Sequence, residues 1–499
     1  MRYTSTRNRA VETTAAHAIT QGISVDGGLF VPTELPQFAD GELRALVGKP
    51  YQEIARTVLG KFLTDFTPAE VAACVDSAYT KERFRSPQIA PLHPLNEEAQ
   101  VLELWHGPTC AFKDMALQIL PHLMRVSAEK TAGGREIVIL VATSGDTGKA
   151  ALEGFRDAAH TRILVFYPEN GVSEMQKLQM VTQEGQNVAV CAIRGNFDDA
   201  QTGVKQIFTD PAMAKTLAAH GMQFSSANSI NWGRLVPQIV YYVSAYCGMV
   251  ENGGVSWGNE IDVVVPTGNF GNILAAYYAK RMGVPIRKLV CASNRNRVLT
   301  DFLQTGTYDR NRPFYTTTSP SMDILISSNL ERLLYHLSGE DDGAVRGMME
   351  SLRQTGKYTV PESVRTALSE LFDAGWCDDE QTARTIRETY ETYGYLLDTH
   401  TAVAVHVYEE YRQRAGDGVP AVIASTANPY KFPASVLHAL GGDNPVWDEF
   451  EKAQRLQVLT GTQIPAPLAS LRGKSPRFTQ VCDRDGMRQV VFGLLGIAE

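Results

Sequence analysis

Short hydrophobic runs recur along the chain, and most are followed by small polar residues and then by a helical pattern. They are rich in Val and Ile and cover residues 101–105, 137–141, 162–167, 187–193, 261–265, 288–292 and 421–424. Continuous apolar strands that alternate with helices are typical of a parallel sheet with helices on both faces. The pattern therefore predicts an α/β protein with parallel sheets.

The pattern also divides the chain into three parts. Residues 1–95 are predicted as a mixed α/β segment, 96–440 as the α/β core with a mostly helical insertion at about 319–412, and 441–499 as a tail rich in turns. A stretch around Pro87, Pro91 and Pro94 is predicted to be a linker. With 499 residues the chain is longer than one hydrophobic core usually serves, so we expect two or three packed units.

Composition and charge exclude several classes of protein. The net charge of −8 gives no general attraction for nucleic acid or anionic lipid. The sequence has no apolar run of roughly eighteen residues, which a membrane span needs, and its N-terminus lacks the apolar stretch of a signal peptide. The seven cysteines show no metal-ligand or redox spacing. We therefore expect a cytoplasmic protein that binds neither nucleic acid, nor membrane, nor a metal ion.

Polar loops directly follow four of the predicted strands. They read TSGDTG at 143–148, PTGNFGN at 266–272, SNRN at 293–296 and STAN at 425–428. In open α/β sheets, ligands bind beyond the carboxyl ends of the strands. We therefore expect these loops to form one ligand site.

The loop PTGNFGN has the features of an anion cradle. Gly268 and Gly271 allow a tight turn and a close approach of the backbone to a ligand. A helix is predicted to follow at once, and its free N–H groups favour an anion. The loop lacks the third glycine of a dinucleotide fingerprint and the Gly-Lys-Ser/Thr of a Walker A loop. Taken alone it could be an ordinary tight turn, but with its neighbours it indicates a phosphate site.

The loop TSGDTG offers a second anion site. The hydroxyl groups of Thr143, Ser144 and Thr147, together with the amides at a helix start, can bind a carboxylate without a basic residue. The alternative is an elaborate helix N-cap. Two such loops on one sheet edge indicate a cofactor phosphate and a substrate carboxylate.

Lys113 is the candidate nucleophile. It lies in HGPTCAFKDMALQ (106–118), between the run at 101–105 and a helix predicted over 112–125. Burial near a helix N-terminus favours the neutral amine that a Schiff-base nucleophile requires. Because most lysines are solvated surface charges, the residues alone leave that alternative open.

These motifs carry a resemblance to a known family. The chain resembles the threonine synthases of the longer kind, nearly end to end. The motifs are AITQGISVDGGLFVP (18–32), HGPTCAFKDMALQ (106–118), ATSGDTGKAA (142–151), YPENGVSEMQ (167–176), RGNFDDAQ (194–201), NSINWGRLVPQ (228–238), VPTGNFGN (265–272), SPSMDILISSNLERLL (319–334) and DTHTAV (398–403). The resemblance implies the fold type II of enzymes that use pyridoxal 5′-phosphate (PLP), which is like the tryptophan synthase β subunit. That fold has two Rossmann-like parallel-sheet units, here with an added N-terminal segment.

The resemblance also implies a role for each site residue. It implies that Lys113 binds PLP as a Schiff base, that Thr426 bonds the pyridine nitrogen, and that Asp146 lies beside the phenolic oxygen. Because two anionic oxygens repel each other, we expect a shared proton or a bridging donor at Asp146. The implied sites are Gly268, Asn269, Phe270, Gly271 and Asn272 for the cofactor phosphate, Thr143, Ser144 and Thr147 for the substrate carboxylate, and Ser229, Asn231 and Arg234 for the substrate phosphate.

The sequence departs from the family pattern in places. The family stretch S-T-A-H-P-A-K-F is STANPYKF here, with Asn428 and Tyr430, so a role that rests on the histidine is in doubt. An additional arginine, Arg295, follows one strand, and its direction is not predicted. We expect His400 and His406 to be packing residues rather than metal ligands, and His106 is a candidate for contact with the cofactor or substrate.

The expected reaction is the conversion of O-phospho-L-homoserine and water into L-threonine and phosphate, the last step of threonine biosynthesis. The alternatives are a threonine synthase-like phospholyase that forms 2-oxobutanoate, ammonia and phosphate, and a non-catalytic relative that binds a metabolite. An oxidoreductase is disfavoured because the dinucleotide fingerprint is missing. We expect a monomer or homodimer.

Overall fold

Two sheets organise the chain, and both lie within the residues that the computed structural model describes, 1–143, 145–170, 172–442 and 444–497. One sheet has six strands, and all of its neighbouring strands are parallel except β4, which is antiparallel to β5. Its order is β14 (Phe372–Trp376), β11 (Ile286–Ser293), β10 (Ile261–Pro266), β15 (Ala421–Ser425), β5 (Ala99–Glu103) and β4 (Leu92–Pro94).

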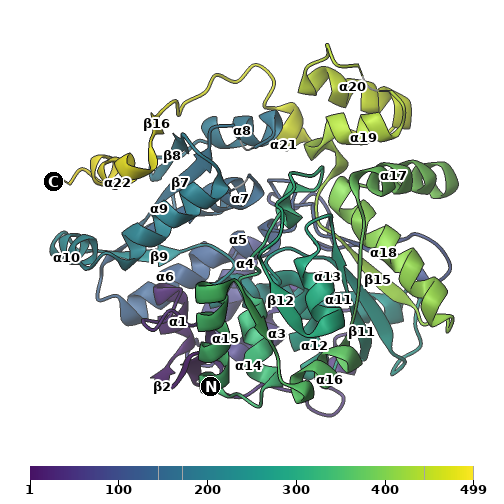
Figure 1. Ribbon diagram of the computed structural model, residues 1–499, viewed down its shortest axis with the longest axis horizontal. Coiled ribbons are helices and arrows are strands. Elements are labelled where there is room, and N and C mark those ends of the chain that lie inside the picture. Colours follow the sequence, from purple (N-terminus) through teal and green to yellow (C-terminus); the bar gives the residue numbers. More distant parts are fainter. Residues whose placement is uncertain (144, 171, 443, 498–499) are drawn as a thin grey trace.

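The second sheet has five strands in the described part of the chain, and all its neighbours are parallel. Its order is β16 (Val481–Cys482), β8 (Val188–Ile193), β7 (Thr161–Pro168), β6 (Glu136–Ala142) and β9 (Met222–Ser226). Figure 1 shows this sheet at the upper left and the six-stranded sheet at the lower right. The predicted parallel α/β architecture is confirmed.

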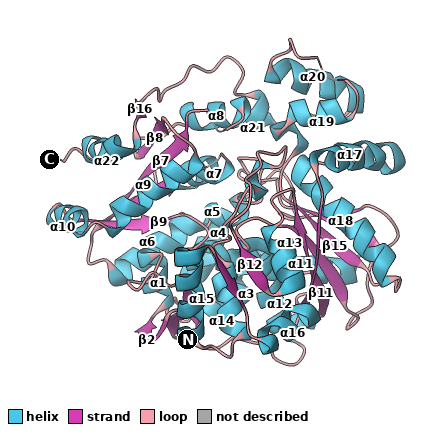
Figure 2. Cartoon of the chain, in the orientation of Figure 1, coloured by secondary structure: helices cyan, strands magenta, loops and turns pink. Residues whose placement is uncertain are grey.

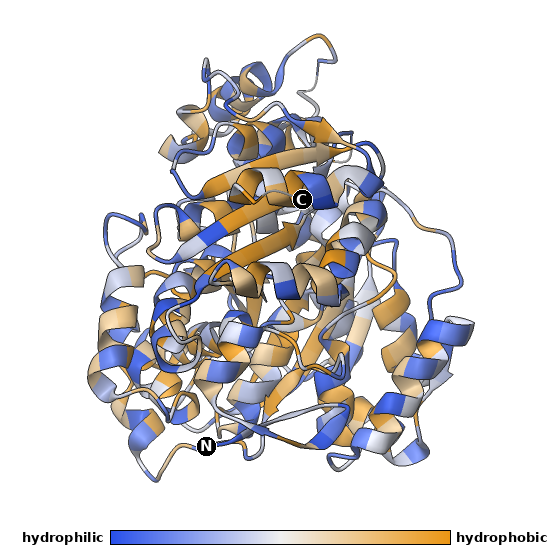
Figure 3. Ribbon diagram, turned by 90° about the vertical axis from the view of Figure 1, so that its left-hand side faces the viewer, coloured by the Kyte–Doolittle hydropathy of each residue, from blue (hydrophilic) through white to orange (hydrophobic). Residues whose placement is uncertain are grey.

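Burial explains why the strongest hydrophobic runs became the central strands. Every residue of β10 is buried, and so is every residue of β6 except Glu136. A strand covered on both faces needs a continuous apolar run rather than alternation, and Figure 3 shows the upper sheet as mainly hydrophobic ribbons. By contrast, the short strands β9 and β14 contain Ser, Asp or Gly, so the hydrophobic pattern does not predict them as strands.

Two predicted segments differ from the structure. The interval 319–412 contributes a strand, β14, to the edge of the six-stranded sheet as well as helices. The proline-rich stretch predicted as a linker includes the edge strand β4, which pairs with β5. Pro94 is tolerated there because an edge strand leaves one row of backbone groups unpaired.

The N-terminal residues pack on the core through aromatic side chains. Tyr3 contacts Trp232 edge-on, with ring centroids 5.3 Å apart, and Phe62 and Tyr278 also lie against Trp232. This segment consists of an antiparallel sheet and four helices: β1 (Tyr3–Ser5), β2 (Asn8–Thr13), β3 (Phe30–Pro32), α1 (Ala15–Gln21), α2 (Glu42–Ala45), α3 (Tyr51–Phe62) and α4 (Pro68–Ala78).

Helices cover the sheets and connect their strands (Figure 2). The long helix α11 packs on α3 and α12, and α18 packs on β10, β11 and β15. A short antiparallel pair, β12 (Thr307–Asp309) and β13 (Lys357–Thr359), lies outside the two main sheets. The helices are α5 (Asp114–Leu117), α6 (Leu120–Thr131), α7 (Asp146–Phe155), α8 (Glu174–Val181), α9 (Phe197–Thr209), α10 (Pro211–Ala219), α11 (Trp232–Glu251), α12 (Gly271–Arg281), α13 (Val298–Thr305), α14 (Leu330–Leu337), α15 (Asp342–Thr355), α16 (Glu362–Leu371), α17 (Asp379–Tyr393), α18 (Thr399–Ala415), α19 (Pro433–Ala439), α20 (Glu449–Thr460), α21 (Ala466–Ala469) and α22 (Met487–Leu495).

The C-terminal tail crosses the molecule from α20 past α21 to α22, as the yellow ribbon in Figure 1 shows. It returns to the five-stranded sheet, where β16 pairs with β8. Within the described ranges, no helix combines the length and apolar composition needed to cross a bilayer.

Candidate active site

A cavity of about 180 Å³ lies where the loops that follow β6, β10 and β15 meet the loop that carries Lys113. The carboxyl ends of strands from both sheets therefore contribute to one site. Its lining contains most of the predicted residues: Lys113, Thr143, Asp146, Thr147, Ser229, Arg234, Gly268, Asn269, Phe270, Gly271, Asn272 and Thr426. Ser144 lies outside the described residues.

Lys113 is a buried amine at the start of α5. Its Nζ donates to Oγ of Ser321 at 3.2 Å and lies 3.6 Å from Oδ2 of Asp146. Burial lowers the pKa of Lys113, and the carboxylate of Asp146 opposes that effect. The loop that carries Lys113 is bonded to the loop that follows β15, because the amide of Phe112 donates to the carbonyl of Thr426 at 2.8 Å. The arrangement provides an amine whose neutral form is favoured, at a fixed place in the cavity.

Asp146 begins α7 and is shared between two lysines. Oδ1 lies 2.9 Å from Nζ of Lys431 and accepts a hydrogen bond from Gln176 at 2.9 Å, while Oδ2 faces Lys113. Burial disfavours its ionised form, but Lys431 and Lys113 outweigh burial and hold the pKa of Asp146 well below its usual range. Lys431 was missed from the sequence, although it is the lysine of the STANPYKF stretch.

The glycine loop between β10 and α12 leaves no room for larger side chains at one position. A Cβ atom on Gly268 would lie 2.5 Å from the carbonyl oxygen of Ser321. Phe270 adopts a left-handed backbone conformation, with φ of 63°, and is the N-cap of α12. The chain therefore turns sharply and points the free N–H groups of the helix into the cavity.

Asn272 presents an unpaired donor to the cavity. Its Oδ1 accepts hydrogen bonds from the hydroxyl groups of Tyr241 and Tyr242 on α11, at 2.7 and 2.5 Å. Its Nδ2 is buried and has no hydrogen-bond partner. A buried amide without a partner is costly, so this group fits a ligand acceptor such as a phosphate oxygen.

Arg234 is a buried cation in the same cavity. Its guanidinium donates to the carbonyl oxygen of Ala227, and its Nε has no partner. Burial lowers the pKa of Arg234 to about 10. Among the described residues no carboxylate lies within ion-pair distance of it, so an anionic ligand would satisfy a charge that the protein leaves unpaired.

The TSGDTG loop is held together by its first residue. Oγ1 of Thr143 accepts from the amides of Gly145 and Gly148, at 3.0 and 2.9 Å. Thr147 lines the cavity at the start of α7. Thr143 and Thr147 therefore line the same cavity as Lys113 and Asp146.

Asn231 corrects the predicted phosphate pocket. The side chain is fully buried outside the lining of the cavity, and its Nδ2 donates to the carbonyls of Ile19 and Ser226, at 2.9 and 2.8 Å. Its Oδ1 caps α11 by accepting from the amide of Gly233. All its polar atoms are occupied, so it supports the helix that carries Arg234 and does not face a ligand.

His400 lines the cavity, which its sequence pattern did not indicate. Its Nδ1 lies 3.0 Å from Oδ1 of Asp398, and the amide of Ser321 donates to its Nε2 at 3.2 Å. His106 is outside the lining and contacts Glu103 at 2.7 Å. In the described chain, no group of three or more His, Cys, Asp and Glu side chains forms a metal centre.

The two departures from the family pattern have local explanations. Oδ1 of Asn428 accepts from the amide of Tyr430 at 3.0 Å and so caps the short turn that ends at Lys431. Arg295 is exposed, and its guanidinium lies 3.9 Å from the ring centroid of Tyr315.

Three family models match the chain along most of its length. "Pyridoxal-phosphate dependent enzyme" matches residues 85–426, "Threonine synthase N terminus" matches 2–79 and "Threonine synthase, C-terminal" matches 401–491. The chain belongs to the threonine synthase family. Its resemblance to that family is confirmed, and so is its fold, the type II fold of PLP enzymes with an added N-terminal segment.

Individual family members agree with this assignment. Threonine synthase of Pseudomonas aeruginosa is 41% identical over 466 residues, which cover 92% of this chain and 96% of that one. Threonine synthase-like 1 of Homo sapiens is 42% identical over 435 residues, or 85% of this chain, and the match spans only 58% of that longer protein. The solved structure of PLP-bound threonine synthase from Brucella melitensis covers 99% of both chains, with a TM-score of 0.87 and 39% identity. The yeast enzyme superposes with a TM-score of 0.88 at 32% identity, also over 99% of both chains.

The cofactor of this enzyme is therefore PLP, and the residues of the cavity fit it. Lys113 offers a buried amine, and Asn272 has an unused donor beside a helix N-terminus.

Proposed function

We propose that this enzyme converts O-phospho-L-homoserine and water into L-threonine and inorganic phosphate. The observation that carries the proposal is the unpaired, buried guanidinium of Arg234 in the cavity that also holds Lys113. The glycine loop suits the cofactor phosphate, so Arg234 remains available for a second anion, the phosphate of the substrate. The similarity to enzymes named threonine synthase over almost the whole chain supports the same reaction.

We assign the other residues by their place in the cavity. Gly268, Asn269, Phe270, Gly271 and Asn272 hold the cofactor phosphate, and Thr426 bonds the pyridine nitrogen. Asp146 lies beside the phenolic oxygen, and Lys431 and Gln176 supply the donors that this position needs. Thr143 and Thr147 bind the substrate carboxylate, and Ser229 assists Arg234 with the substrate phosphate.

When bound, PLP supplies an electron sink for the bonds broken at the substrate. Lys113 acts as the base: its Nζ removes the proton from Cα and then a proton from Cβ. Arg234 holds the substrate phosphate in place until that group leaves from Cγ. A proton is then delivered to Cγ, which becomes the methyl group, water adds its hydroxyl at Cβ and releases a proton, and a proton returns to Cα. Burial of the cavity excludes other water and strengthens each of these contacts.

A second outcome uses the same cavity. If no water adds at Cβ, elimination of phosphate leaves an imine, and hydrolysis of that imine by one water gives 2-oxobutanoate and ammonia beside the phosphate. The match to threonine synthase-like 1 proteins, at 42–43% identity, keeps this reaction as the alternative. Both reactions need Lys113 and Arg234, so the residues that line the cavity serve either one. A metabolite-binding protein without turnover is the third alternative, and an intact Lys113 argues against it.

Product analysis separates these outcomes. The purified enzyme with PLP is incubated with O-phospho-L-homoserine, and phosphate, threonine, 2-oxobutanoate and ammonia are measured. Equal amounts of threonine and phosphate are expected. Keto acid with ammonia would instead establish the phospholyase, and binding without any product would establish the non-catalytic alternative. Lys113→Ala should lose both the visible absorbance of bound cofactor and all product, and normal turnover by this variant would refute the assignment of Lys113.

A further inference from the structure

Lys431 joins three segments that are distant in the sequence. It ends the turn η2 (Pro429–Lys431), and its side chain is completely buried. Besides Asp146 on α7, its Nζ contacts the carbonyl of Thr109 in the lysine loop at 2.9 Å and Oε1 of Gln179 on α8 at 3.1 Å. A buried ammonium has to be satisfied by fixed acceptors, so its three partners are held in one arrangement.

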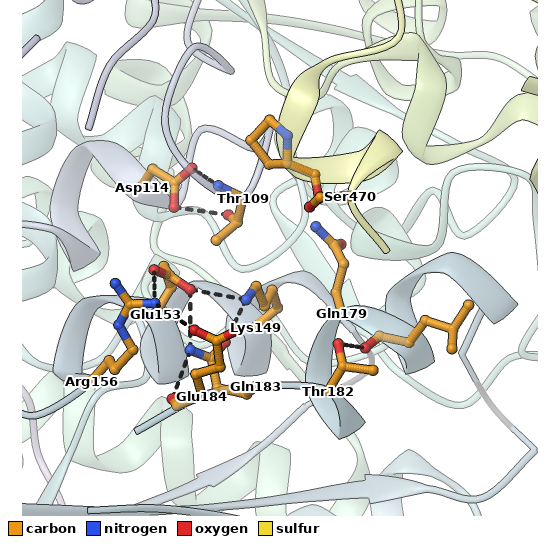
Figure 4. Close-up of polar contacts among 12 residues, drawn as sticks. Thr109, Asp114, Lys149, Glu153, Arg156, Gln179, Thr182, Gln183, Glu184 and Ser470 are labelled. Atoms are coloured by element: carbon orange, nitrogen blue, oxygen red, sulfur yellow. Dashed lines mark hydrogen bonds and ion pairs between the residues drawn. The ribbon is translucent and has the colours of Figure 1, made fainter. Parts of the chain in front are cut away.

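The contact with Thr109 extends to the residue next to Lys113. The amide and the hydroxyl of Thr109 both donate to the carboxylate of Asp114, each at 2.8 Å, and Figure 4 shows these two bonds. Burial raises the pKa of Asp114 to about 6. Lys431 therefore fixes the loop on which Lys113 lies as well as the carboxylate that faces it.

Several charged groups surround the amine of Lys113. Asp146 comes from α7, Arg234 from α11 and Lys431 from η2, and the neighbouring Asp114 begins α5. His400 of α18 reaches this region through the amide of Ser321. Without Lys431, Lys113 would be the one ammonium within ion-pair distance of Asp146 among the described residues. Asp146 would then hold a proton on Lys113 more strongly.

We propose that Lys431 is a positioning residue that neutralises Asp146 and fixes the lysine loop against α7 and α8, which leaves the amine of Lys113 free to react. The inference rests on the proposed role of Lys113. Lys431 acts through Asp146 and Thr109 and does not line the cavity itself.

Lys149 provides a matched control. It lies on α7 and is a partly buried lysine, paired with Oε2 of Glu153 at 3.0 Å and with Gln183. Figure 4 shows this group, to which Arg156 and Glu184 are joined. Lys149 is absent from the lining of the cavity and has no contact with Asp146. Lys149→Met therefore removes a partly buried ammonium from the helix that carries Asp146, without changing the charge balance at Lys113.

The test follows the covalent binding of PLP to the full-length protein freed of cofactor, by visible absorbance, between about pH 6 and pH 9. We expect Lys431→Met to bind PLP roughly tenfold more slowly than wild type at pH 7, with the midpoint of the pH profile about one pH unit higher. Lys149→Met should lower the melting temperature but keep the wild-type midpoint. A folded Lys431→Met with the wild-type midpoint would overturn the proposal.

A double variant keeps the test decisive if Lys431→Met does not fold. Lys431→Met with Asp146→Asn removes both charges of the buried Lys431–Asp146 pair together, so it should fold with a midpoint close to that of wild type. A midpoint about one unit above wild type in the double variant would contradict the proposal. Failure of the wild-type protein to bind PLP would instead refute the role of Lys113, and this inference with it.

Discussion

The hydroxyl of Tyr241 donates a hydrogen bond to the side-chain oxygen of Asn272 at 2.7 Å, and this contact fixes which end of the amide faces the cavity. Tyr242 donates to the same oxygen, and the NH₂ group of Asn272, a residue that lines the cavity, is left without a protein partner. Two buried residues of α11 thus leave free the donor on α12 that we propose for the cofactor phosphate.

This relationship predicts weaker cofactor binding when both hydroxyls are lost. In the Tyr241→Phe/Tyr242→Phe variant the amide of Asn272 is free to rotate, and we expect the dissociation constant of PLP to rise roughly five- to tenfold, about 1 kcal/mol. Spectroscopic titration of the cofactor-free protein measures it. Tyr246→Phe is the control, because Tyr246 lies on the same helix and its hydroxyl bonds the 258–259 backbone instead. Equal affinities in the three proteins would contradict the prediction.

Arg234 should determine the affinity for the phosphate of the substrate. Loss of a charged hydrogen bond costs about 1.5–3 kcal/mol, so Arg234→Met should raise KM for O-phospho-L-homoserine roughly 10- to 100-fold. Arg234→Lys keeps the charge but lacks the planar guanidinium group, so its KM should lie between those of wild type and Arg234→Met. Steady-state kinetics check this, with the exposed Arg295→Met expected to behave as wild type. An unchanged KM in Arg234→Met would remove Arg234 from the substrate site.

Asn231 should matter for stability. Asn231→Ala leaves the carbonyls of Ile19 and Ser226 without their donor and removes the cap of α11, so we expect a loss of about 1–3 kcal/mol. Urea or thermal unfolding measures this loss in the free energy of unfolding. Asn311→Ala is the control, because Asn311 is exposed and its replacement should change the free energy of unfolding by less than about 0.5 kcal/mol. A raised KM with unchanged stability would restore Asn231 to the substrate site.

His336 predicts a dependence of stability on pH. Burial, followed by the charges of Arg281 and Arg332, lowers its pKa to about 3, and Tyr278 contacts its Nε2 at 2.9 Å. The unfolded chain therefore binds the proton more tightly, so stability falls as the pH drops below about 6.5 toward 3. As the pH falls from 8 to 5.5, protonation of His336 in the unfolded chain should lower the free energy of unfolding by about 1 kcal/mol. The melting temperature of His336→Gln should fall less over this interval than that of wild type, and parallel decreases would contradict the assignment.

Much of the fold and the site was predictable because the determining signals are local. A strand buried on both faces must be a continuous apolar run, as β6 and β10 are, and a glycine loop before a helix carries its anion chemistry in its own backbone. The role of Lys113 as the Schiff-base lysine was predicted from the family motifs around it. The edge strands β4 and β14 were missed because short edge strands need no such run.

The sequence by itself therefore determined the class of fold, the family, the cofactor and twelve of the residues that line the cavity. Only the tertiary structure decided which polar groups are already occupied and which are free. Asn231 and Arg234 are three residues apart, yet the side chain of Asn231 is fully bonded to the backbone, while Arg234 keeps an Nε without a partner in the cavity. Lys431 and Asp146 are far apart in the chain and meet at 2.9 Å. Such differences depend on partners brought together by packing, and no local pattern encodes them.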